Sequence, residues 1–330
     1  MHFYMVNPCP HWLIPNGVIE VIVMTKQGII VVGSINIDMV FSLPRLPAIG
    51  ETVSGASFAA YPGGKGANQA VAAARLGVPT AIIGCVGDDS WGHTLLSGLQ
   101  REGINCDHVG QAPGASGCAG ILVAAGGDNI IAVDTGANAW LTPDKAARAG
   151  DAISRSKILM TQLEIPLETV EAALKLAKKA GVITILDPAP VKELPPEILT
   201  LVDYLTPNAL EASSLTGIDV HCWNTAAKAA RKLRSQGAST VLITMGKLGA
   251  FFSGPEGEVR INAPRVDALD ATAAGDAFNG ALAAALVHGV QPDIAADIAA
   301  AAGALAVTRF GAQPSLPALA ELGEVVNLPW

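Results

Sequence analysis

The sequence has little charge and few aromatic residues. Only 15% of its 330 residues are Asp, Glu, Lys or Arg and 5% are aromatic, whereas 50% are hydrophobic and 35 are glycine. This composition excludes a disordered chain and indicates a compact protein with a large core, built as one large α/β domain or as two domains. The net charge of −8 argues against nucleic acid or an anionic membrane as the main partner.

Several common site motifs are missing. The five cysteines form no CxxC pair, and their odd number predicts no disulfide framework and a reducing, cytoplasmic location. The six histidines include no HExxH, so we expect no zinc site. The longest apolar stretch, near residues 298–307, is too short to span a membrane. There is neither a Walker A loop nor a GxGxxG motif after a strand, which argues against a P-loop NTPase and a dinucleotide-binding domain.

The first residues have no periodic pattern. Prolines, histidines and a tryptophan are scattered through residues 1–15 in no regular order, and no basic segment or cleavage site suggests a signal peptide. Periodic sequence begins at Ile29. We therefore expect residues 1–28 to be an N-terminal extension outside the fold and residues 29–330 to form the domain.

Short apolar runs alternate with amphipathic segments along the rest of the chain. Strands are predicted at 29–33, 80–86, 158–162, 182–186 and 240–244, and helices at 90–101 (with Ser90 as N-cap), 167–180 and 225–236. This alternation predicts a parallel sheet with helices on both faces, a three-layer α/β/α sandwich. Two antiparallel pieces, near 37–61 and 117–135, predict a smaller sheet that stands off the main domain as a lid.

Polar residues follow several of the predicted strands. In parallel sheets the strand ends meet at one edge, where ligands bind. Asn36 and Asp38 have the i, i+2 spacing that puts both on one face of an extended segment, which suits a polyol, although an Asx turn without a ligand gives the same pattern. For Asp187 we favour a cap or a solvated carboxylate. The residues at this edge are Asn36, Asp38, Glu164, Asp187, Asn208, Glu211 and Thr244.

A glycine-rich string, Pro62-Gly-Gly-Lys-Gly-Ala-Asn68, precedes a helix predicted over 69–76. Adjacent glycines allow the backbone to approach a ligand closely, and Lys65 and Asn68 supply hydrogen-bond donors. A second string of small residues, Asp270 to Gly280, leads into an apolar helix. Its free N–H groups could hold a phosphate, and Asp276 could take a proton from an attacking hydroxyl or could only cap the helix.

Four strings together carry a family resemblance: Gly33-Ser-Ile-Asn-Ile-Asp38, Gly63-Gly-Lys-Gly-Ala-Asn-Gln69, Thr206-Pro-Asn208 with Glu211, and Asp270 to Gly280. They resemble the ribokinases among the phosphofructokinase-B-type carbohydrate kinases, over residues 29 to about 317. The resemblance implies a ribokinase-like α/β/α fold over 29–330, a lid sheet that covers the sugar, and a homodimer formed through the lid. It also implies transfer of a phosphoryl group from ATP to O5 of D-ribose, giving ribose 5-phosphate.

The resemblance further implies the role of each site residue. Asp276 would be the general base, and the backbone of Ala273, Ala274, Gly275 and Asp276 the anion hole. Sugar contacts would come from Asn36, Asp38, Gly64, Lys65, Asn68 and Glu164. The nucleotide side, with Mg²⁺ bound through ATP, would hold Asn208, Glu211, Thr244, Gly246, Gly249 and Gly275. An activating K⁺ would lie among Asp270, Thr272, Ala306, Arg309, Gly311 and Ser315.

Other functions remain open at this point. The same chemistry could serve 2-deoxyribose, fructose or another ketose, or a nucleoside. A sugar-binding regulator that has lost catalysis would keep the fold, but it would not need Asp276, its small-residue loop and the glycine-rich string together. A nicotinamide-dependent dehydrogenase is disfavoured by the missing GxGxxG motif.

Overall fold

The computed structural model describes residues 26–125 and 128–330. The expected extension, residues 1–28, lies outside the described residues except at its end, where Gln27 N donates to Arg155 O at 3.0 Å. Residues 126 and 127, part of a predicted turn, also lie outside the described part of the chain.

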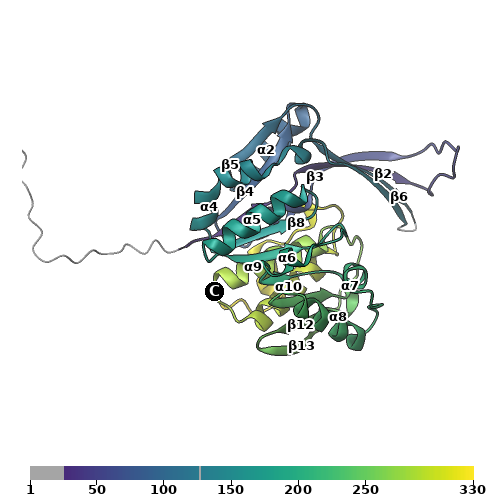
Figure 1. The fold of residues 1–330 in the computed structure, drawn as a ribbon. Coiled ribbons are helices and arrows are strands. Elements are labelled where there is room, and N and C mark those ends of the chain that lie inside the picture. The colour runs from purple at the N-terminus through teal and green to yellow at the C-terminus, as the bar shows by residue number, and fades with distance from the viewer. Residues whose placement is uncertain (1–25, 126–127) are drawn as a thin grey trace, which may run out of the picture.

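A nine-stranded sheet forms the centre of the molecule (Figure 1). Its order is β13-β12-β11-β10-β9-β8-β1-β4-β5, parallel from β11 to β5, with β12 and β13 added as an antiparallel hairpin at one edge. The apolar runs at 29–33, 158–162, 182–186 and 240–244 are therefore strands, as predicted. The bounds are β1 Ile29–Val32, β4 Thr80–Gly87, β5 Asn105–Ala112, β8 Ile158–Gln162, β9 Ile183–Asp187, β10 Tyr204–Leu205, β11 Thr240–Thr244, β12 Ala250–Gly254 and β13 Gly257–Ile261.

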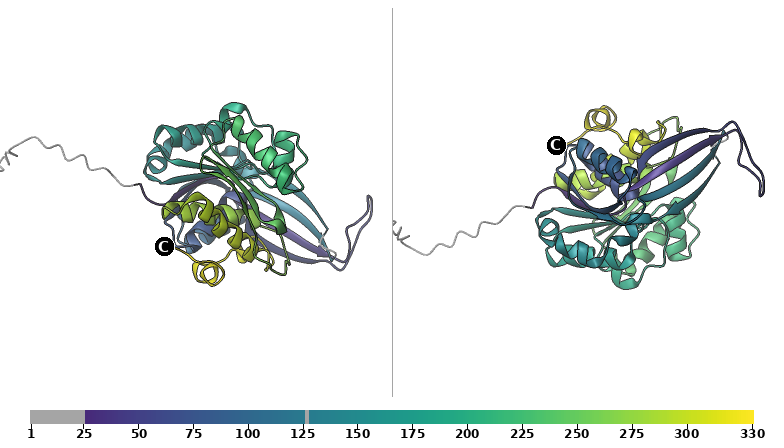
Figure 2. Two further views of the ribbon diagram at one scale, coloured as in Figure 1. Left: turned by 90° about the horizontal axis from the view of Figure 1, so that it is seen from below. Right: turned by 90° about the horizontal axis from the view of Figure 1, so that it is seen from above.

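Helices cover both faces of this sheet (Figure 2). Strand β1 shows why: Ile29 and Val31 belong to the core that includes α1, α9 and α10, whereas Ile30 and Val32 belong to the core that includes α5 and α8. Alternate residues of a strand point to opposite faces, so an all-apolar strand supplies two cores. The predicted three-layer α/β/α sandwich is confirmed.

The helices are α1 Lys65–Arg75, α2 Ser90–Arg101, α3 Pro143–Arg148, α4 Gly150–Arg155, α5 Leu167–Lys179, α6 Pro196–Leu199, α7 Ala209–Thr216, α8 Trp223–Ser235, α9 Ala274–Val287, α10 Pro292–Ala306 and α11 Leu319–Val325. Short 3₁₀ turns are η1 Gly136–Trp140, η2 Gly246–Leu248 and η3 Gln313–Ser315. Within the described ranges, no helix combines the length and the apolar character needed to cross a membrane.

A four-stranded second sheet, in the order β3-β2-β6-β7, extends away from the main body (Figure 1). Its strands are β2 Asn36–Leu43, β3 Ser57–Gly63, β6 Gly117–Ala124 and β7 Asn129–Asp134. These are the two segments in which antiparallel pieces were predicted. Only three residues separate the end of β1 from the start of β2, so the second sheet is attached directly above the carboxyl ends of the central strands.

Two predictions about helix starts are wrong. The N-cap of α2 is Asp89, whose Oδ1 accepts from Gly92 N at 2.6 Å, and Ser90 is already the first helical residue. Asp and Ser are both good caps, so the local sequence does not distinguish these two neighbours. Helix α1 begins at Lys65 and not at Gln69, with Gly64 at φ +88° as its N-cap. Most of the glycine-rich string is therefore the first turn of a helix.

Candidate active site

A cleft of about 440 Å³ opens at the carboxyl ends of β9, β10 and β11. Residues from the glycine-rich string, the 206–211 segment, the 244–246 loop and the start of α9 meet there, as the sequence predicted for the edge of a parallel sheet. The lining residues are Lys65, Asp187, Ala189, Thr206, Asn208, Ala209, Leu210, Glu211, Thr244, Met245, Gly246, Ala271, Ala273, Ala274, Gly275, Asp276 and Asn279.

Asp276 lies in the first turn of α9 and is buried. Asn68 Nδ2 donates to Asp276 Oδ2 at 2.9 Å, and Gln69 Nε2 donates to Oδ1 at 3.2 Å. Both donors belong to α1, so the carboxylate is held by another helix and does not cap its own. Burial raises the pKa of Asp276, and Lys65 and these two donors partly offset that effect.

The N-terminus of α9 is open to an anion. Among the described residues, the backbone N–H groups of Gly275 and Asp276 have no acceptor. Ala273 precedes the helix at φ +58°, a left-handed conformation that costs free energy for a residue with a side chain. Gly275 lines the cleft, and a Cβ added to it would meet no atom within 4 Å. Free N–H groups and the helix dipole together favour a phosphate here.

Asp187 is not the solvated carboxylate or cap that we favoured from the sequence. It is 5% exposed, accepts a hydrogen bond from Gln69 Nε2 at 2.9 Å, and lies 3.7 Å from Lys65 Nζ. Burial raises the pKa of Asp187 to about 7 although Lys65 opposes the shift. Burial alone would lower the pKa of Lys65, but the surrounding carboxylates, led by Asp187, raise it, so the lysine stays cationic.

Glu164 is the acceptor that joins β8 to the start of α1. Its Oε2 accepts from Ser34 Oγ at 2.6 Å, from Lys65 N at 3.0 Å and, at 3.5 Å, from Asn36 Nδ2. Asn36 is buried, and its Oδ1 accepts from Asn138 Nδ2 at 2.6 Å. Asn36 and Asp38 both lie on β2, so the alternative of a local Asx turn is wrong.

Asp38 lies on the same face of β2 as Asn36, and it packs against the backbone of Gly63 on β3. A Cβ at Gly63 would be 2.2 Å from Asp38 Oδ2, so a larger residue there would displace the Asp38 carboxyl group. Burial, with the negative charges of Glu164 and Asp276, raises the pKa of Asp38 from 3.8 to about 7. The carboxyl group therefore changes its protonation near neutral pH.

The glycines of the string are required by close backbone contacts. A Cβ at Gly64 would be 2.7 Å from Asn36 N, and one at Gly66 would be 2.6 Å from Gly33 C and from Ser34 N. The start of α1 is thereby pressed against the end of β1. This contact places Lys65 and Asn68 at the cleft.

Asn208 and Glu211 form a capping box at the start of α7. Asn208 N donates to Glu211 Oε2 at 2.8 Å, and Glu211 N donates to Asn208 Oδ1 at 2.9 Å. Burial raises the pKa of Glu211. A bridge pairs Asn208 with Thr244, which brings the 244–249 loop beside them, and Met245 N donates to Gly249 O at 2.7 Å.

The residues expected around K⁺ are partly linked in the structure. Asp270 Oδ1 accepts from Thr272 N at 2.9 Å, and Asp270 Oδ2 accepts from Gly311 N at 2.9 Å. The loop before α9 is thus tied to the loop after α10. The side chain of Arg309 instead forms an ion pair with Glu321, so only its backbone could serve the site, and Ser315 Oγ donates to Ala312 O.

No cluster of three or more His, Cys, Asp or Glu side chains that could hold a metal ion occurs within residues 26–125 and 128–330. A divalent ion in the cleft would therefore depend on ligands from a bound molecule, as Mg²⁺ does when it arrives on nucleotide phosphates.

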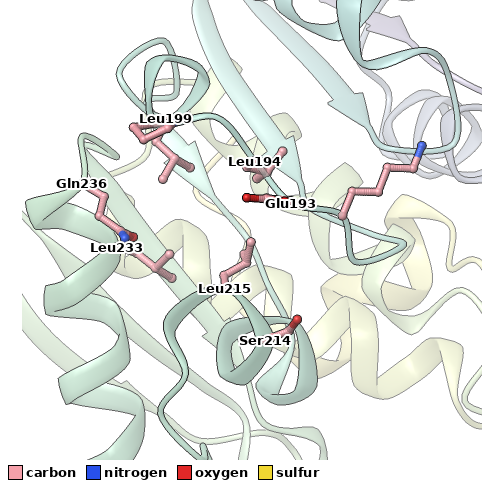
Figure 3. A pocket seen from close by; sticks show the side chains of 9 residues that line it. Glu193, Leu194, Leu199, Ser214, Leu215, Leu233 and Gln236 are labelled. Atoms are coloured by element: carbon pink, nitrogen blue, oxygen red, sulfur yellow. The ribbon is translucent and has the colours of Figure 1, made fainter.

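A second cavity, of about 350 Å³, lies between the 192–199 segment, α7 and α8 (Figure 3). Leucines form much of its wall, and Figure 3 shows Leu194, Leu199, Leu215 and Leu233 around it with Glu193, Ser214 and Gln236. None of the predicted site residues lines it, so the chemistry lies in the first cleft.

Four residues that were not predicted from the sequence complete the site. Gln69 binds two carboxylates, Gln162 donates to Gln69 Oε1 at 2.6 Å, Asn138 donates to Asn36, and Asn279 Oδ1 accepts from Thr206 Oγ1 at 2.7 Å. Gln69 and Asn279 lie inside two of the strings that carried the resemblance. Gln162, the last residue of β8, lies at the edge where ligands were expected. Nothing in the sequence marks Asn138.

Comparison with known proteins identifies the family. The model of the pfkB family of carbohydrate kinases matches residues 26–319. A ribokinase of Haemophilus influenzae is 42% identical over 303 residues, which are 92% of this chain and 99% of that protein. A deoxyribokinase of Salmonella typhi is 36% identical over 304 residues, 92% and 99% of the two chains.

Among solved structures, Arabidopsis thaliana ribokinase complexed with ribose and ATP matches with a TM-score of 0.85 and 32% identity. The match covers 92% of this chain and 100% of that one. The family model spans most of the chain, and the relatives match over nearly their whole length. The chain belongs to the pfkB family of carbohydrate kinases.

Proposed function

We propose that the protein transfers the γ-phosphoryl group of ATP to O5 of D-ribose, giving ribose 5-phosphate. The observation that carries the proposal is Asp276: a buried carboxylate at the floor of the cleft, beside two backbone N–H groups that lack acceptors. A base next to an anion site is the arrangement that phosphoryl transfer to a hydroxyl requires.

Asp276 acts as the general base. It accepts the proton of the sugar O5 hydroxyl as that oxygen attacks the γ-phosphorus. The bond between the γ-phosphorus and the oxygen that links it to the β-phosphate breaks, and ADP leaves. The N–H groups of Gly275 and Asp276, after the strained Ala273, stabilise the negative charge on the transferred group, whereas the Ala274 N–H already donates to Ala271 O at 3.3 Å. Most of the rate enhancement then comes from positioning and charge neutralisation.

The sugar binds between Asp276 and the second sheet. Asn36, Asp38, Gly64, Lys65, Asn68 and Glu164 supply its hydrogen-bonding partners. Asn68 supports this role, because its Oδ1 is buried and has no partner among the described residues, so it is free to accept from a sugar hydroxyl. The Lys65 ammonium, which faces the cleft, is placed to neutralise charge at the phosphoryl group as well.

ATP occupies the part of the cleft lined by Asn208, Glu211, Thr244, Gly246 and Gly275, with Gly249 closing the 244–249 loop. Asn208 and Glu211 organise Mg²⁺ and the phosphates, largely through water. Bound Mg²⁺ neutralises phosphate charge, and the raised pKa of Glu211 is expected to fall when the cation is present.

A K⁺ ion holds the loops that form the anion site. Asp270, Thr272 and Gly311 are already joined by hydrogen bonds, and Ala306, Arg309 and Ser315 contribute mainly backbone oxygens. The ion's contribution would be to fix the loop before α9, without touching the substrate.

The protein forms a homodimer through the second sheet, which also closes over the sugar. Ile131 and Val133 of β7 are exposed, and their strand register puts them on the same face of the sheet as Asp38. Ile131→Asp should dissociate the dimer, as measured by sedimentation velocity, whereas Val325→Asp on the exposed side of α11 should not. A wild-type protein that is monomeric at micromolar concentration would contradict this part of the proposal.

ATP-dependent phosphorylation of a sugar panel tests the function directly. The panel holds ribose, 2-deoxyribose, fructose and adenosine, each with and without K⁺. We expect K⁺-stimulated turnover of ribose above the others. If no sugar is phosphorylated but ribose still binds, the protein is a sugar-binding regulator.

The main alternative substrate is 2-deoxyribose, because a deoxyribokinase is among the relatives. Asn36 and Asp38 favour ribose, since an amide beside a carboxyl group can donate to and accept from adjacent hydroxyls. If Asn36 contacts the 2-hydroxyl, Asn36→Ala should therefore weaken the binding of ribose more than the binding of 2-deoxyribose. Equal losses for both sugars would remove this reason for preferring ribose.

A further inference from the structure

Two glutamines from different elements connect the cleft's two most buried carboxylates. Gln162 ends β8, and Gln69 lies in the first turns of α1. Gln162 Nε2 donates to Gln69 Oε1 at 2.6 Å, and Gln69 Nε2 donates to Asp187 Oδ2 at 2.9 Å and to Asp276 Oδ1 at 3.2 Å. Both glutamines are at most 1% exposed.

The direction of this chain is determined by its ends. When Asp187 and Asp276 are ionised they only accept hydrogen bonds, which requires the orientation that the structure has, with the Gln69 NH₂ group towards both. Its two amide hydrogens serve one carboxylate each. The Oε1 atom then points to Gln162, whose NH₂ group must face it. If the Gln69 amide turned over, its oxygen would face two other acceptors.

The arrangement leaves one group unsatisfied. Gln162 Oε1 is buried and has no hydrogen-bond partner among the described residues, and a Cβ at Gly33 would lie 2.2 Å from it. An unpaired buried carbonyl costs free energy, and an apolar side chain at this position would avoid the cost. Stability alone therefore does not explain why residue 162 is a glutamine. Its NH₂ group, in contrast, has a defined partner in Gln69 Oε1.

We infer that Gln162 and Gln69 form an amide relay that positions Asp276 for proton abstraction, with Gln162 fixing the orientation of Gln69. This inference rests on the proposed function, in which Asp276 is the base. Gln69 and Gln162 are positioning residues: Gln69 contacts the carboxylates of Asp276 and Asp187, Gln162 contacts Gln69, and neither is assigned a contact with the sugar or the nucleotide. The relay also fixes Asp276 relative to Asp187 and hence to Lys65.

The relay predicts a change in the pH dependence of the chemical step. A hydrogen bond donated to the ionised form of Asp276 stabilises that form, so removal of the donor should raise the pKa of the base. The other charged groups that influence Asp276 are Lys65 of α1, Asp187 at the end of β9, Glu164 after β8 and Asp38 of β2. A substitution at Gln69 keeps all four of these groups but also removes the donor to Asp187, at 2.9 Å.

The test is the single-turnover rate of ribose phosphorylation between pH 5 and 9 for Gln69→Met. We expect a loss of about 10- to 100-fold near pH 7, little change in ribose affinity, and an acid limb moved to higher pH, so that the deficit shrinks at pH 9. The matched control is Gln111→Met, which removes an exposed amide that donates to Asp88 Oδ1 at 2.9 Å and should leave the profile unchanged.

Gln162→Met is the second variant, and it tests the relay if Gln69→Met does not fold. It keeps both donors of Gln69 but frees the amide to rotate, so a smaller loss with the same shift of the acid limb is expected. An unchanged rate, or a loss that is equal at every pH, overturns the inference. Asp276→Asn separates the two proposals: if it retains turnover, the base assignment fails, and if it is inactive while both glutamine variants behave as wild type, only the relay fails.

Discussion

Asn68 Nδ2 donates a 2.9 Å hydrogen bond to Asp276 Oδ2, although 208 positions separate the two residues in the chain. The bond joins the start of α1 to the start of α9. These helices pack closely, since a Cβ at Gly280 would lie 2.4 Å from Ala72 Cβ. The close approach turns two distant small-residue strings into one site.

Asp276→Asn should remove nearly all turnover and leave ribose binding almost unchanged. The amide keeps the size of the side chain but cannot accept the hydroxyl proton, and loss of a general base costs about 10²- to 10⁴-fold. Steady-state kinetics and calorimetric titration with ribose measure the two effects. Asp219→Asn, at an exposed position, is the control for loss of one charge. Near-normal turnover of Asp276→Asn would show that another group is the base.

Gly66→Ala should destabilise the protein by about 1–3 kcal/mol and weaken ribose binding. The added Cβ would meet the backbone at Gly33 and Ser34, which cannot move without separating α1 from β1. Gly98→Ala in α2 is the matched helical control: its Cβ meets only Arg101 Nη2, at 3.8 Å, and should stabilise by about 0.5–1 kcal/mol. Denaturant unfolding measures both. Equal effects of the two substitutions would refute the close-contact explanation.

Asp38→Asn should raise the melting temperature at pH 8, and the gain should shrink towards pH 5. The pKa of Asp38 is about 7 in the folded protein and ordinary, near 3.8, in the unfolded chain. Between these values the folded state binds more protons, so this carboxyl group lowers stability as pH rises through the window. The amide does not titrate. The exposed Asp267→Asn is the control, and a gain independent of pH would contradict burial of Asp38 as the cause.

Asp270→Ala should abolish stimulation by K⁺. It should also reduce turnover by roughly 10-fold, because the loop that positions the phosphoryl group is less firmly held. It removes the acceptor that joins Thr272 N to Gly311 N, so the loop before α9 loses its link to the loop after α10. Initial rates in KCl and in NaCl measure the effect. The outcome that would contradict it is a variant with the same ratio of the two rates as the wild type.

Asp187 shows what the sequence could not reveal. A carboxylate after a strand is equally compatible with a cap, a solvated group and a buried ion pair, because these differ only in what packs around it. Lys65 and Gln69, which decide the matter, come from a helix more than a hundred residues earlier. The same holds for Gln162: an amide at the end of a strand has no characteristic spacing with its partner.

Local signals predicted local structure well but not the first residue of each helix. Asp89 and Ser90 are both good caps, and only the backbone geometry selects Asp89. Lys65 starts α1 because Gly64 adopts φ +88° just before it. Glycine permits this conformation, but the presence of a glycine does not predict it.

The sequence by itself determined the parallel sheet with helices on both faces, the position of the second sheet, and the residue types needed for a phosphoryl-transfer site. Apolar periodicity and strand-end polarity are properties of neighbours in the chain, so they can be read without the fold. Only the tertiary structure decided which side chains meet: that Asn68 and Gln69 hold Asp276, that Asp187 is buried beside Lys65, and that Asp38 titrates near pH 7. Those properties depend on burial and on charges brought from distant segments, which no local pattern specifies.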